Sequence, residues 1–323
     1  AVASAGIMSK ALSYIAMTGR VLMQHCEDPE LGGGMMNEGA LASRMGLDGW
    51  PRVAEEVVIQ RDILLNMRQS IGCRYHVQHV SSGGSVELIR RARQDLFGQA
   101  HITAEVTPHH LLLTEQCCKG YDTLYKVNPP LRTPPDIEQL LAAVADGTIT
   151  ILATDHAPHT QEEKELEFAA APYGLIGLEC ALPLYVRALI ESGTIDWPAM
   201  VAMMTLNPAR LCDLRGKGEL TAGADADVTV IEPGVRTAQP SRPTSGSPCR
   251  LLCVASLIPR KDHLMLVEAL QAGVEAVFLG PFGGIGGIAS TLLGLRHARI
   301  LGSLECPVAL FRGALRGHGG TID

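Results

Sequence analysis

Side chains that can bind metal ions follow several apolar stretches of this sequence. His25 comes after "RVLMQ" and His79 after "YHVQ", while Asp155 and His159 lie in "ILATDHAPH". A fourth stretch, "AEVTPHH", ends in two adjacent histidines. Neutral imidazoles and carboxylates are common ligands of Zn²⁺ in proteins. A bound ion lowers the pKa of its water towards neutrality, and an aspartate such as Asp155 can then accept and return the proton. These residue types therefore predict a site that binds a metal ion and moves a proton.

A structural role is the alternative for each of these histidines. A single imidazole at the end of a strand is more often simply hydrogen-bonded than bound to a metal ion. Because four strand ends carry such residues, one shared site is favoured over four unrelated structural roles. Residue type and spacing alone still leave the reaction unnamed.

The residues of this site are far apart in the sequence, so secondary structure must bring them together. Apolar stretches of strand character alternate with amphipathic segments of helical period. Strands are expected at 21–23, 73–79, 101–107 and 148–154. Helices are expected at 4–18, 51–70, 85–98, 136–147, 176–193 and 197–214.

The order of strand, polar end and helix occurs four times. This alternation indicates an α/β fold with a parallel sheet and helices packed outside it. In a (β/α) barrel, the carboxyl ends of the strands form the rim where catalytic groups gather. The predicted ligands all fall at such ends.

The composition is that of a globular protein with an aliphatic core. Of 323 residues, 46% are hydrophobic, 19% are charged and only 4% are aromatic, and the net charge is −7. No apolar run is long enough to cross a bilayer, and no basic patch suggests nucleic acid as a partner. The nine cysteines are odd in number and irregularly spaced, which argues against a disulfide framework and favours a reducing cytoplasm. No C-x-x-C pair is present, which argues against a thiolate zinc site. The first residue is Ala, so the chain is expected to begin inside a longer protein.

Four segments are expected along the chain. Residues 1–215 form the βα region, 216–233 a small β unit, 234–249 a linker rich in Pro, Ser and Gly, and 250–323 an α/β segment. Residues 1–233 carry 18 Lys+Arg against 29 Asp+Glu, whereas the remainder carries nine against five, which supports two units.

Several motifs occur in the order found in one family. They are "MQHCEDPEL", "YHVQHVSS", "AEVTPHHLLLTE", "YKVNPPLRT", "LATDHAPHTQEEK", "APYGLIGLE", "MTLNPAR" and "GELTAGADADVTVIE". Together they closely resemble the class I dihydroorotases of the cyclic amidohydrolase group, over residues 4 to 232. Hydantoinases and allantoinases are similar, but "HCEDPEL", "VTPHHLLLTE" and "DHAPHTQEEK" look like dihydroorotase.

The resemblance implies a metal-dependent (β/α)₈ barrel of TIM type beside a small β-sandwich. The reaction would be the reversible cyclisation of N-carbamoyl-L-aspartate to L-dihydroorotate in cytoplasmic pyrimidine synthesis, with two Zn²⁺ per complete site. The protein would be a homo-oligomer that binds a small-molecule substrate and neither nucleic acid nor membrane.

The resemblance also implies roles for individual residues. His25 and His79 match ligands of one zinc, and Asp155 matches the acid/base that binds the other. Asn128 and His159 match residues that contact the substrate. Two backbone positions match the substrate-side loop, Pro172 and Gly174. The remaining histidines of these motifs are expected to be structural, namely His76, His109, His110 and His156, and residues 162–164 to be a solvated helix start.

Some family motifs are absent. The H-x-H of the first barrel strand, the arginine after it, an early substrate asparagine and the carboxylate that bridges the metals have no counterpart. The chain is therefore expected to carry strands five to eight, with an incomplete ligand set and open sheet edges that need a partner. The isolated chain is expected to be inactive, and a related cyclic amidohydrolase or a non-catalytic partner are the alternatives.

The last segment resembles another class of protein. "RLLCVASLIPRKDHLMLVEAL" is similar to the start of the nucleotide-sugar-binding domain of retaining glycosyltransferases, with Arg260 and Lys261 near the donor diphosphate. Residues 284–289 read G-x-G-x-x-A after an expected strand, with Glu305 beyond, as in a partial dinucleotide fingerprint. An ordinary helix explains the first stretch equally well, and a flexible Gly-rich turn is the better explanation of the second. Nucleotide-sugar binding through this segment is the remaining alternative function.

Overall fold

The computed structural model describes residues 2–68, 72–94 and 101–225, and beyond them only the backbone of five short strands. The chain divides into two compact units, Ala1–Asp196 and Trp197–Asp323. Among the described residues, no helix is both long and apolar enough to cross a membrane. The predicted linker 234–249, the helix expected after Arg260 and the Gly-rich turn lie outside the described residues.

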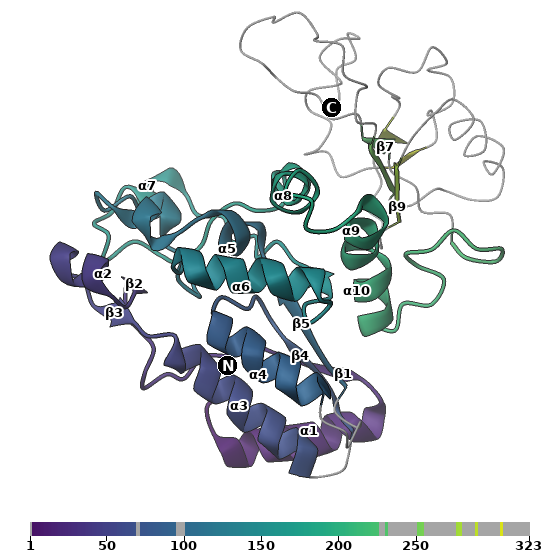
Figure 1. The fold of residues 1–323 in the computed structure, drawn as a ribbon, viewed down its shortest axis with the longest axis horizontal. Helices are drawn as coiled ribbons and strands as arrows, with labels where there is room; N and C mark the ends of the chain where they lie inside the picture. Colours follow the sequence, from purple (N-terminus) through teal and green to yellow (C-terminus); the bar gives the residue numbers. More distant parts are fainter. Residues whose placement is uncertain are drawn as a thin grey trace, which may run out of the picture. The chain divides into compact units, whose positions relative to one another are not determined.

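A four-stranded parallel sheet forms the centre of the first unit (Figure 1). Its strands are β1 (Val21–Gln24), β4 (Arg74–Val77), β5 (Ile102–Val106) and β6 (Ile151–Leu152), in the order β1-β4-β5-β6. Every neighbouring pair is parallel, with Val21 opposite Arg74 and Glu105 opposite Ile151. This confirms the predicted α/β class. Because the strands are parallel, their carboxyl ends lie at one edge of the sheet.

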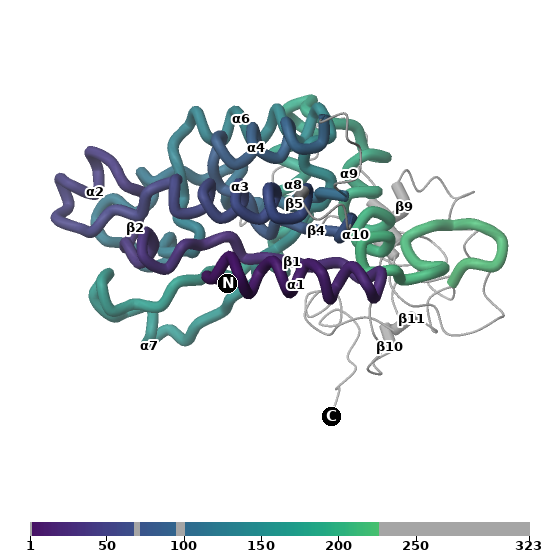
Figure 2. The backbone as a smooth tube through the Cα atoms, turned by 90° about the horizontal axis from the view of Figure 1, so that it is seen from below, coloured from purple at the N-terminus to yellow at the C-terminus, as the bar shows by residue number. Residues whose placement is uncertain are grey.

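The helix that precedes these strands and the helices that connect them pack against one another outside the sheet. They are α1 (Ala5–Thr18), α3 (Val53–Arg68), α4 (Gly83–Gln94) and α6 (Pro134–Ala145). The contacts run in the order α1–α3, α3–α4 and α4–α6, and α1 lies beside β1 (Figure 2). The layering is the one expected for βα units.

Capping side chains set the ends of two of these helices. The Ser4 hydroxyl accepts the Ile7 N–H at 3.4 Å at the start of α1, and Gly19 ends the helix with a φ of 67°. Helix α6 begins with a capping box in which Thr133 and Asp136 bind each other's backbone N–H. The predicted starts of both helices are confirmed to within two residues.

Two predicted helices are broken. Residues 197–214 form α9 (Trp197–Met204) and α10 (Leu206–Leu211), which are divided at Thr205. Residues 176–193 contain a loop, the short helix α8 (Ala181–Tyr185) and a π-helical turn, Val186–Ile190. The loop forms because Nδ1 of His156 accepts the N–H groups of Gly177 and Leu178 at 3.0 and 3.2 Å. These two N–H groups therefore bond to an imidazole about twenty residues away, and not to the backbone carbonyls of a helix.

Short elements complete the first unit. They are β2 (Met36–Asn37), α2 (Ala40–Met45), β3 (Gly49–Trp50), α5 (Pro108–Leu112), the 3₁₀ turns Glu115–Cys118 and Thr123–Tyr125, and α7 (Gln161–Lys164). β2 and β3 pair in parallel, and both are too short for sequence periodicity to reveal. Helix α7 confirms the helix start expected at 162–164.

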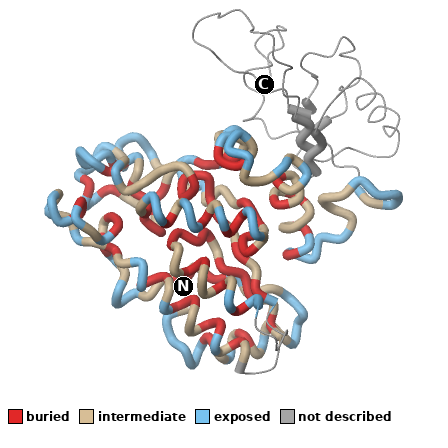
Figure 3. Tube along the Cα trace, viewed as in Figure 1, coloured by how far each residue is buried: buried red, intermediate tan, exposed pale blue. Residues whose placement is uncertain are grey.

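The core lies between the sheet and the helices. Along β5, Ile102, Ala104 and Val106 are buried, while Thr103 and Glu105 on the opposite face are half-buried. Figure 3 shows buried positions, in red, running along the central strands. The alternation turns Glu105 away from the helix-covered face of the sheet.

The second unit contains α9 (Trp197–Met204), α10 (Leu206–Leu211), and strands β7 (Val230–Ile231), β8 (Leu251–Val254), β9 (Ala276–Leu279), β10 (Ile288–Ala289) and β11 (Leu304–Glu305). β8 pairs with β7 antiparallel and with β9 in parallel, and β10 pairs with β11 antiparallel. The strand expected before residues 284–289 is confirmed as β9.

Candidate active site

Two predicted metal ligands meet at the carboxyl end of the sheet. His25 follows β1 and His79 follows β4, and these strands are neighbours. The two imidazole rings lie edge to face, with centroids 4.5 Å apart and planes at 77°. The parallel pairing of β1 and β4 thus brings together residues that are 54 positions apart in the sequence.

Both imidazoles keep a buried nitrogen without a hydrogen bond. Nδ1 of His25 and Nδ1 of His79 have no hydrogen-bond partner among the described residues. The nearest carboxylate to the first is Oε2 of Glu27, at 3.6 Å, beyond hydrogen-bond reach. Burial, and then the nearby His79, lowers the pKa of His25 to about 4. The ring is therefore neutral at pH 7, which is the form that binds a metal ion.

Asp155 lies close enough to His79 for the two groups to interact. Burial raises the pKa of the Asp155 carboxyl, the imidazole of His79 opposes this rise, and the carboxylate of Glu105 adds to it. A carboxyl group with a raised pKa suits proton transfer near neutral pH.

His79 and Asp155 also share an unusual backbone conformation. Their φ angles are 30° and 46°, in the left-handed region that non-glycine residues rarely adopt. Only four non-glycine residues of the described chain have a positive φ, and two of them are these predicted site residues. Such conformations persist where the surrounding structure holds them, and they concentrate at functional sites.

Glu105 is a residue of this site that the sequence analysis missed. Its Oε2 bonds to Nε2 of His76 at 2.9 Å, and its Oε1 accepts the backbone N–H of His79 at 3.3 Å. The signal that could have found it is a carboxylate in the middle of the apolar strand "ITAEV". Glu105 thus connects the strand ends of β4 and β5.

Three histidines that the sequence analysis left as structural have bonded rings. His76 bonds to Thr103 and Glu105, and His110 to Thr107 and the Pro129 carbonyl. Nδ1 of His156 accepts two backbone N–H groups.

His109 differs from these three. Its Nε2 is buried and has no hydrogen-bond partner among the described residues. Burial, and then the nearby His79, lowers the pKa of His109 to about 3. This imidazole is neutral at pH 7 and lies near the ring of His79.

The predicted substrate residues lie in two connected segments. Nδ2 of Asn128 donates to Oε2 of Glu27 at 3.0 Å, and the same carboxylate is the one near His25. His159 contacts the Tyr173 carbonyl through Nε2 at 2.9 Å. The Gly174 N–H donates to the Lys126 carbonyl at 2.9 Å, two residues before Asn128.

The predicted loop position Pro172 is also bonded. Its carbonyl accepts a hydrogen bond from Nζ of Lys164 at 2.8 Å. A carbonyl oxygen can accept two hydrogen bonds, so this contact does not use its full capacity.

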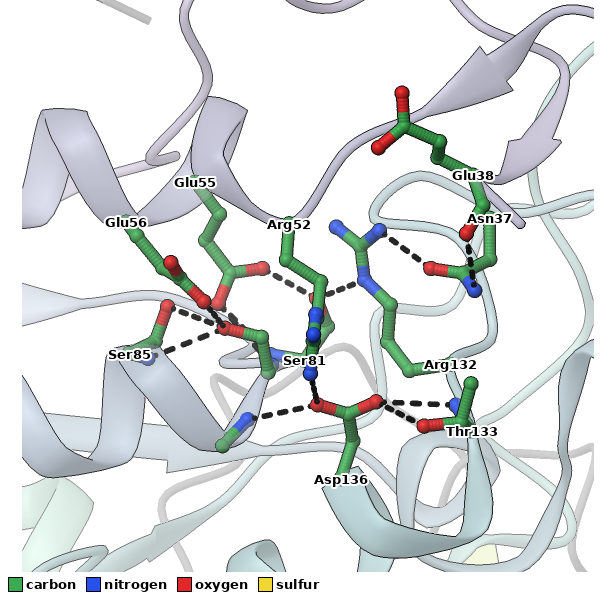
Figure 4. Close-up of polar contacts among 12 residues, drawn as sticks. Asn37, Glu38, Arg52, Glu55, Glu56, Ser81, Ser85, Arg132, Thr133 and Asp136 are labelled. Atoms are coloured by element: carbon green, nitrogen blue, oxygen red, sulfur yellow. Dashed lines mark hydrogen bonds and ion pairs between the residues drawn. The ribbon is translucent and has the colours of Figure 1, made fainter.

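A buried polar network supports the segment after His79 (Figure 4). The guanidinium of Arg132 donates to Oγ of Ser81, Oδ1 of Asn37 and the Trp50 carbonyl, at 3.1, 2.9 and 2.7 Å. The Glu55 carboxylate accepts the N–H groups of Ser81 and Ser82 at 3.1 and 3.3 Å. Because Ser81 lies two residues from His79, this network holds the turn that carries the imidazole.

The same network reaches the start of α6. Asp136 accepts from Arg52 at 3.0 Å and from the Gly83 N–H at 3.1 Å. Figure 4 shows these groups arranged around Ser81 and Arg132.

The described side chains supply part of a metal site. His25 and His79 fit two imidazole ligands, because each keeps an unbonded buried nitrogen. Within residues 2–68, 72–94 and 101–225, no group of three or more His, Cys, Asp or Glu side chains is arranged to hold a metal ion. The pair therefore does not form a complete ligand set by itself.

Comparison with curated proteins shows similarity to dihydroorotases over most of the chain. The "Dihydroorotase" of Pelotomaculum thermopropionicum is 48% identical over 233 residues, which are 72% of this chain and 53% of that protein. The "Dihydroorotase" of Streptomyces coelicolor is 45% identical over 232 residues, 71% of this chain and 53% of that protein. The chain thus spans about half the length of the curated relatives it matches.

Solved structures show a similar fold. L-hydantoinase from Arthrobacter aurescens is 30% identical, with a TM-score of 0.60 over 69% of this chain and 50% of that one. Dihydroorotase from Saccharomyces cerevisiae, at 17% identity and a TM-score of 0.52 over 65% of this chain and 54% of that one, shares the fold. The four parallel strands are therefore part of a TIM-type barrel.

Two family models match the sequence. Residues 1–85 match the Dihydro-orotase-like family, and residues 66–256 match the Amidohydrolase family. The second match covers more than half of the chain and includes the segments of His79, Asn128, Asp155 and His159. The chain therefore belongs to the amidohydrolase family.

Proposed function

We propose that this chain is part of a dihydroorotase, which interconverts N-carbamoyl-L-aspartate and L-dihydroorotate in pyrimidine synthesis. The observation that carries the proposal is the meeting of His25 and His79 at the carboxyl end of the sheet, with Asp155 near enough to His79 for their charges to interact. The names of the curated relatives support the choice of substrate.

In this proposal His25 and His79 hold one zinc ion, and Asp155 contributes to a second. The remaining ligands would come from outside the described residues. Bound zinc would polarise the amide carbonyl of the substrate and acidify a water molecule.

Asp155 moves the proton in this reaction. During ring opening it accepts a proton from the attacking water and delivers it to the ring nitrogen as the C–N bond breaks. Ring closure reverses these steps. The raised pKa of Asp155 supports this role, because a carboxyl group must hold the proton between the two transfers.

Asn128 and His159 bind and orient the substrate. The amide of Asn128 and the imidazole of His159 offer hydrogen bonds to a polar, anionic ring. The backbone groups at Pro172 and Gly174 complete this side of the site. The contacts of Asn128 with Glu27 and of His159 with Tyr173 support defined positions for both side chains.

Hydantoin hydrolysis is the second candidate function. The fold similarity to L-hydantoinase, at 30% identity, favours it over more distant amidohydrolase reactions. Hydantoin and dihydroorotate both contain a cyclic amide, so parallel assays of the two rings separate these candidates.

The decisive experiment supplies the amino-terminal half of the relatives, to which no part of this chain corresponds. The 323-residue chain is co-purified with the amino-terminal half of the Pelotomaculum thermopropionicum dihydroorotase, and dihydroorotate hydrolysis is measured with zinc. We expect hydrolysis, and a loss of about a hundredfold or more in kcat for Asp155→Asn. Asp48→Asn, at an exposed aspartate, is the matched control.

Three outcomes bear on the proposal. If the complex hydrolyses hydantoin but not dihydroorotate, hydantoin would replace dihydroorotate as the proposed substrate. If it hydrolyses neither ring, the result would support a non-catalytic partner. Hydrolysis by the isolated chain would contradict the prediction that it is inactive alone. The predicted homo-oligomer and cytoplasmic location stay predictions, which light scattering and cell fractionation can test.

A further inference from the structure

Lys126 places a buried ammonium group beneath the 168–174 loop, the segment that contains Pro172 and Gly174. The side chain is among the largest fully buried ones of the chain, and the residue is only 2% exposed. Its Nζ donates to the carbonyls of Phe168, Ala169 and Ala171 at 2.6, 3.1 and 2.7 Å. An ammonium group has three N–H donors, so three carbonyls of one loop account for all of them.

Aromatic rings complete the surroundings of this ammonium. Nζ lies 4.5 Å from the centroid of the Tyr173 ring and 5.5 Å from that of Phe168. Both distances are within the range of a cation–π contact. A lysine is rarely buried unless its charge is compensated, and here carbonyl dipoles and ring faces provide the compensation.

The backbone of Lys126 holds the other end of the same loop. Its carbonyl accepts the Gly174 N–H at 2.9 Å. One residue therefore binds the loop twice, by its side chain near the start and by its main chain near the end. Because Asn128 follows two residues later, the loop and the segment of Asn128 are joined through Lys126.

The loop is also attached to the rest of the site. Nε2 of His159 bonds to the Tyr173 carbonyl, and the Tyr173 hydroxyl donates to the Gly34 carbonyl, both at 2.9 Å. The ring of Tyr173 packs edge to face on Trp50, with centroids 5.7 Å apart. Displacement of the loop would therefore move the partner of His159 and change the surroundings of Trp50.

We propose that Lys126 is a positioning residue that locks the 168–174 loop against the segment of Asn128, so that both sides of the substrate site keep one relative geometry. This inference rests on the proposed function of these segments in substrate binding. Lys126 acts through the loop and the Asn128 segment and does not itself contact the reacting atoms.

The test compares hydrogen exchange of the full chain with that of Lys126→Met, which keeps most of the length of the side chain and removes its donors. We expect the amides of residues 168–174 to exchange about tenfold to a hundredfold faster, while those of α6 and β4 are unchanged. Lys119→Met, at an exposed lysine, is the control and should leave the loop unchanged. Unchanged exchange in Lys126→Met, or equal acceleration throughout the unit, would overturn the proposal.

Chemical rescue separates the need for N–H donors from the need for charge. In Lys126→Ala, propylammonium should restore slow exchange of the loop, whereas tetramethylammonium, which has no N–H, should not. Equal rescue by both ions would overturn the hydrogen-bonding role. Trp50 fluorescence, recorded in a Trp197→Phe background, should follow the same pattern.

A measurement on the unaltered chain covers the case in which these variants do not fold. Reductive methylation should modify Nζ of Lys126 at least about tenfold more slowly than Nζ of exposed Lys119, because all three donors of the buried amine are in use. Equal rates would contradict the proposal. None of these experiments measures hydrolysis, so their outcome is independent of the proposed function.

Discussion

The Glu105 carboxylate accepts the backbone N–H of His79 at 3.3 Å and so holds a residue whose φ is 30°. The same carboxylate bonds to Nε2 of buried His76 at 2.9 Å. A half-buried acid on β5 therefore supports both the strand that precedes the site and the strained residue within it.

We expect Glu105→Ala to lower the free energy of unfolding by about 1–3 kcal/mol, because it leaves the ring nitrogen of His76 and the N–H of His79 without their acceptor. Glu105→Gln should lose less, since its amide oxygen can still accept one of the two bonds. Urea unfolding of the full chain measures both. Glu138→Ala, at an exposed glutamate of α6, is the control. An equal loss of unfolding free energy in this control would contradict a specific role for Glu105.

We expect His79→Asn to change stability by less than about 1 kcal/mol, because asparagine tolerates a positive φ. The same change removes one of two paired imidazoles, so zinc affinity should fall at least about tenfold. Isothermal titration with zinc measures this. His101→Asn, at an exposed histidine, should bind zinc as the unaltered chain does, and equal affinity in His79→Asn would exclude His79 as a ligand.

The start of α6 predicts a dependence of stability on pH. Burial opposes ionisation of Asp136, but hydrogen bonds from Thr133, Gly83 and Arg52 outweigh it and hold the pKa of this carboxyl below its ordinary value of 3.8. A depressed pKa in the folded state stabilises the protein above the unfolded value. That contribution should be present above about pH 4 and lost as the pH falls further.

Asp136→Asn tests this directly. We expect this variant to lower the free energy of unfolding at pH 7 by about 1.5–3 kcal/mol. The difference in unfolding free energy between the variant and the unaltered chain should become smaller as the pH falls below 3.8. Urea unfolding measured from about pH 2.5, roughly one unit below the transition, up to about pH 7 gives the curve. A constant difference at all pH values would contradict the assignment.

Gly174 combines a positive φ with close neighbours. Its φ is 134°, and an added Cβ would lie 2.7 Å from Cβ of Ala157 and 3.0 Å from Nε2 of His159. We expect Gly174→Ala to destabilise the chain by about 2–4 kcal/mol and to displace His159.

Gly147 provides the matched control for this change. Its φ is 76°, and nothing lies within 4 Å of an added Cβ. Gly147→Ala should therefore cost only the conformational term of about 1 kcal/mol. Equal losses at the two positions, measured by urea unfolding, would show that the contact with Ala157 and His159 has no effect.

Local patterns were sufficient to predict the strands and several helices of the first unit. Ser4 and the apolar period after it predicted α1, and Pro108 correctly marked the end of β5. These features depend on residues within a few positions of each other, so the sequence alone reveals them.

Contacts between distant residues were not predictable in this way. The break at residues 176–180 depends on His156, and the support of His79 depends on Glu105 and Arg132. Lys126 looks like a surface residue in "YKVNPP", yet carbonyls more than forty positions later bind its ammonium group. No local pattern encodes which distant group will complete a buried polar residue.

The sequence by itself determined which side chains follow the apolar strands, and hence, through parallel pairing, that His25 and His79 share one edge of the sheet. Only the tertiary structure decided which imidazoles have both ring nitrogens hydrogen-bonded. His76 and His110 have both ring nitrogens bonded, whereas His25 and His79 each keep a buried nitrogen without a partner among the described residues. The reason is physical: the positions of the strands along the chain follow from local hydrophobic periodicity, but the partners of an imidazole come from residues that only folding brings near.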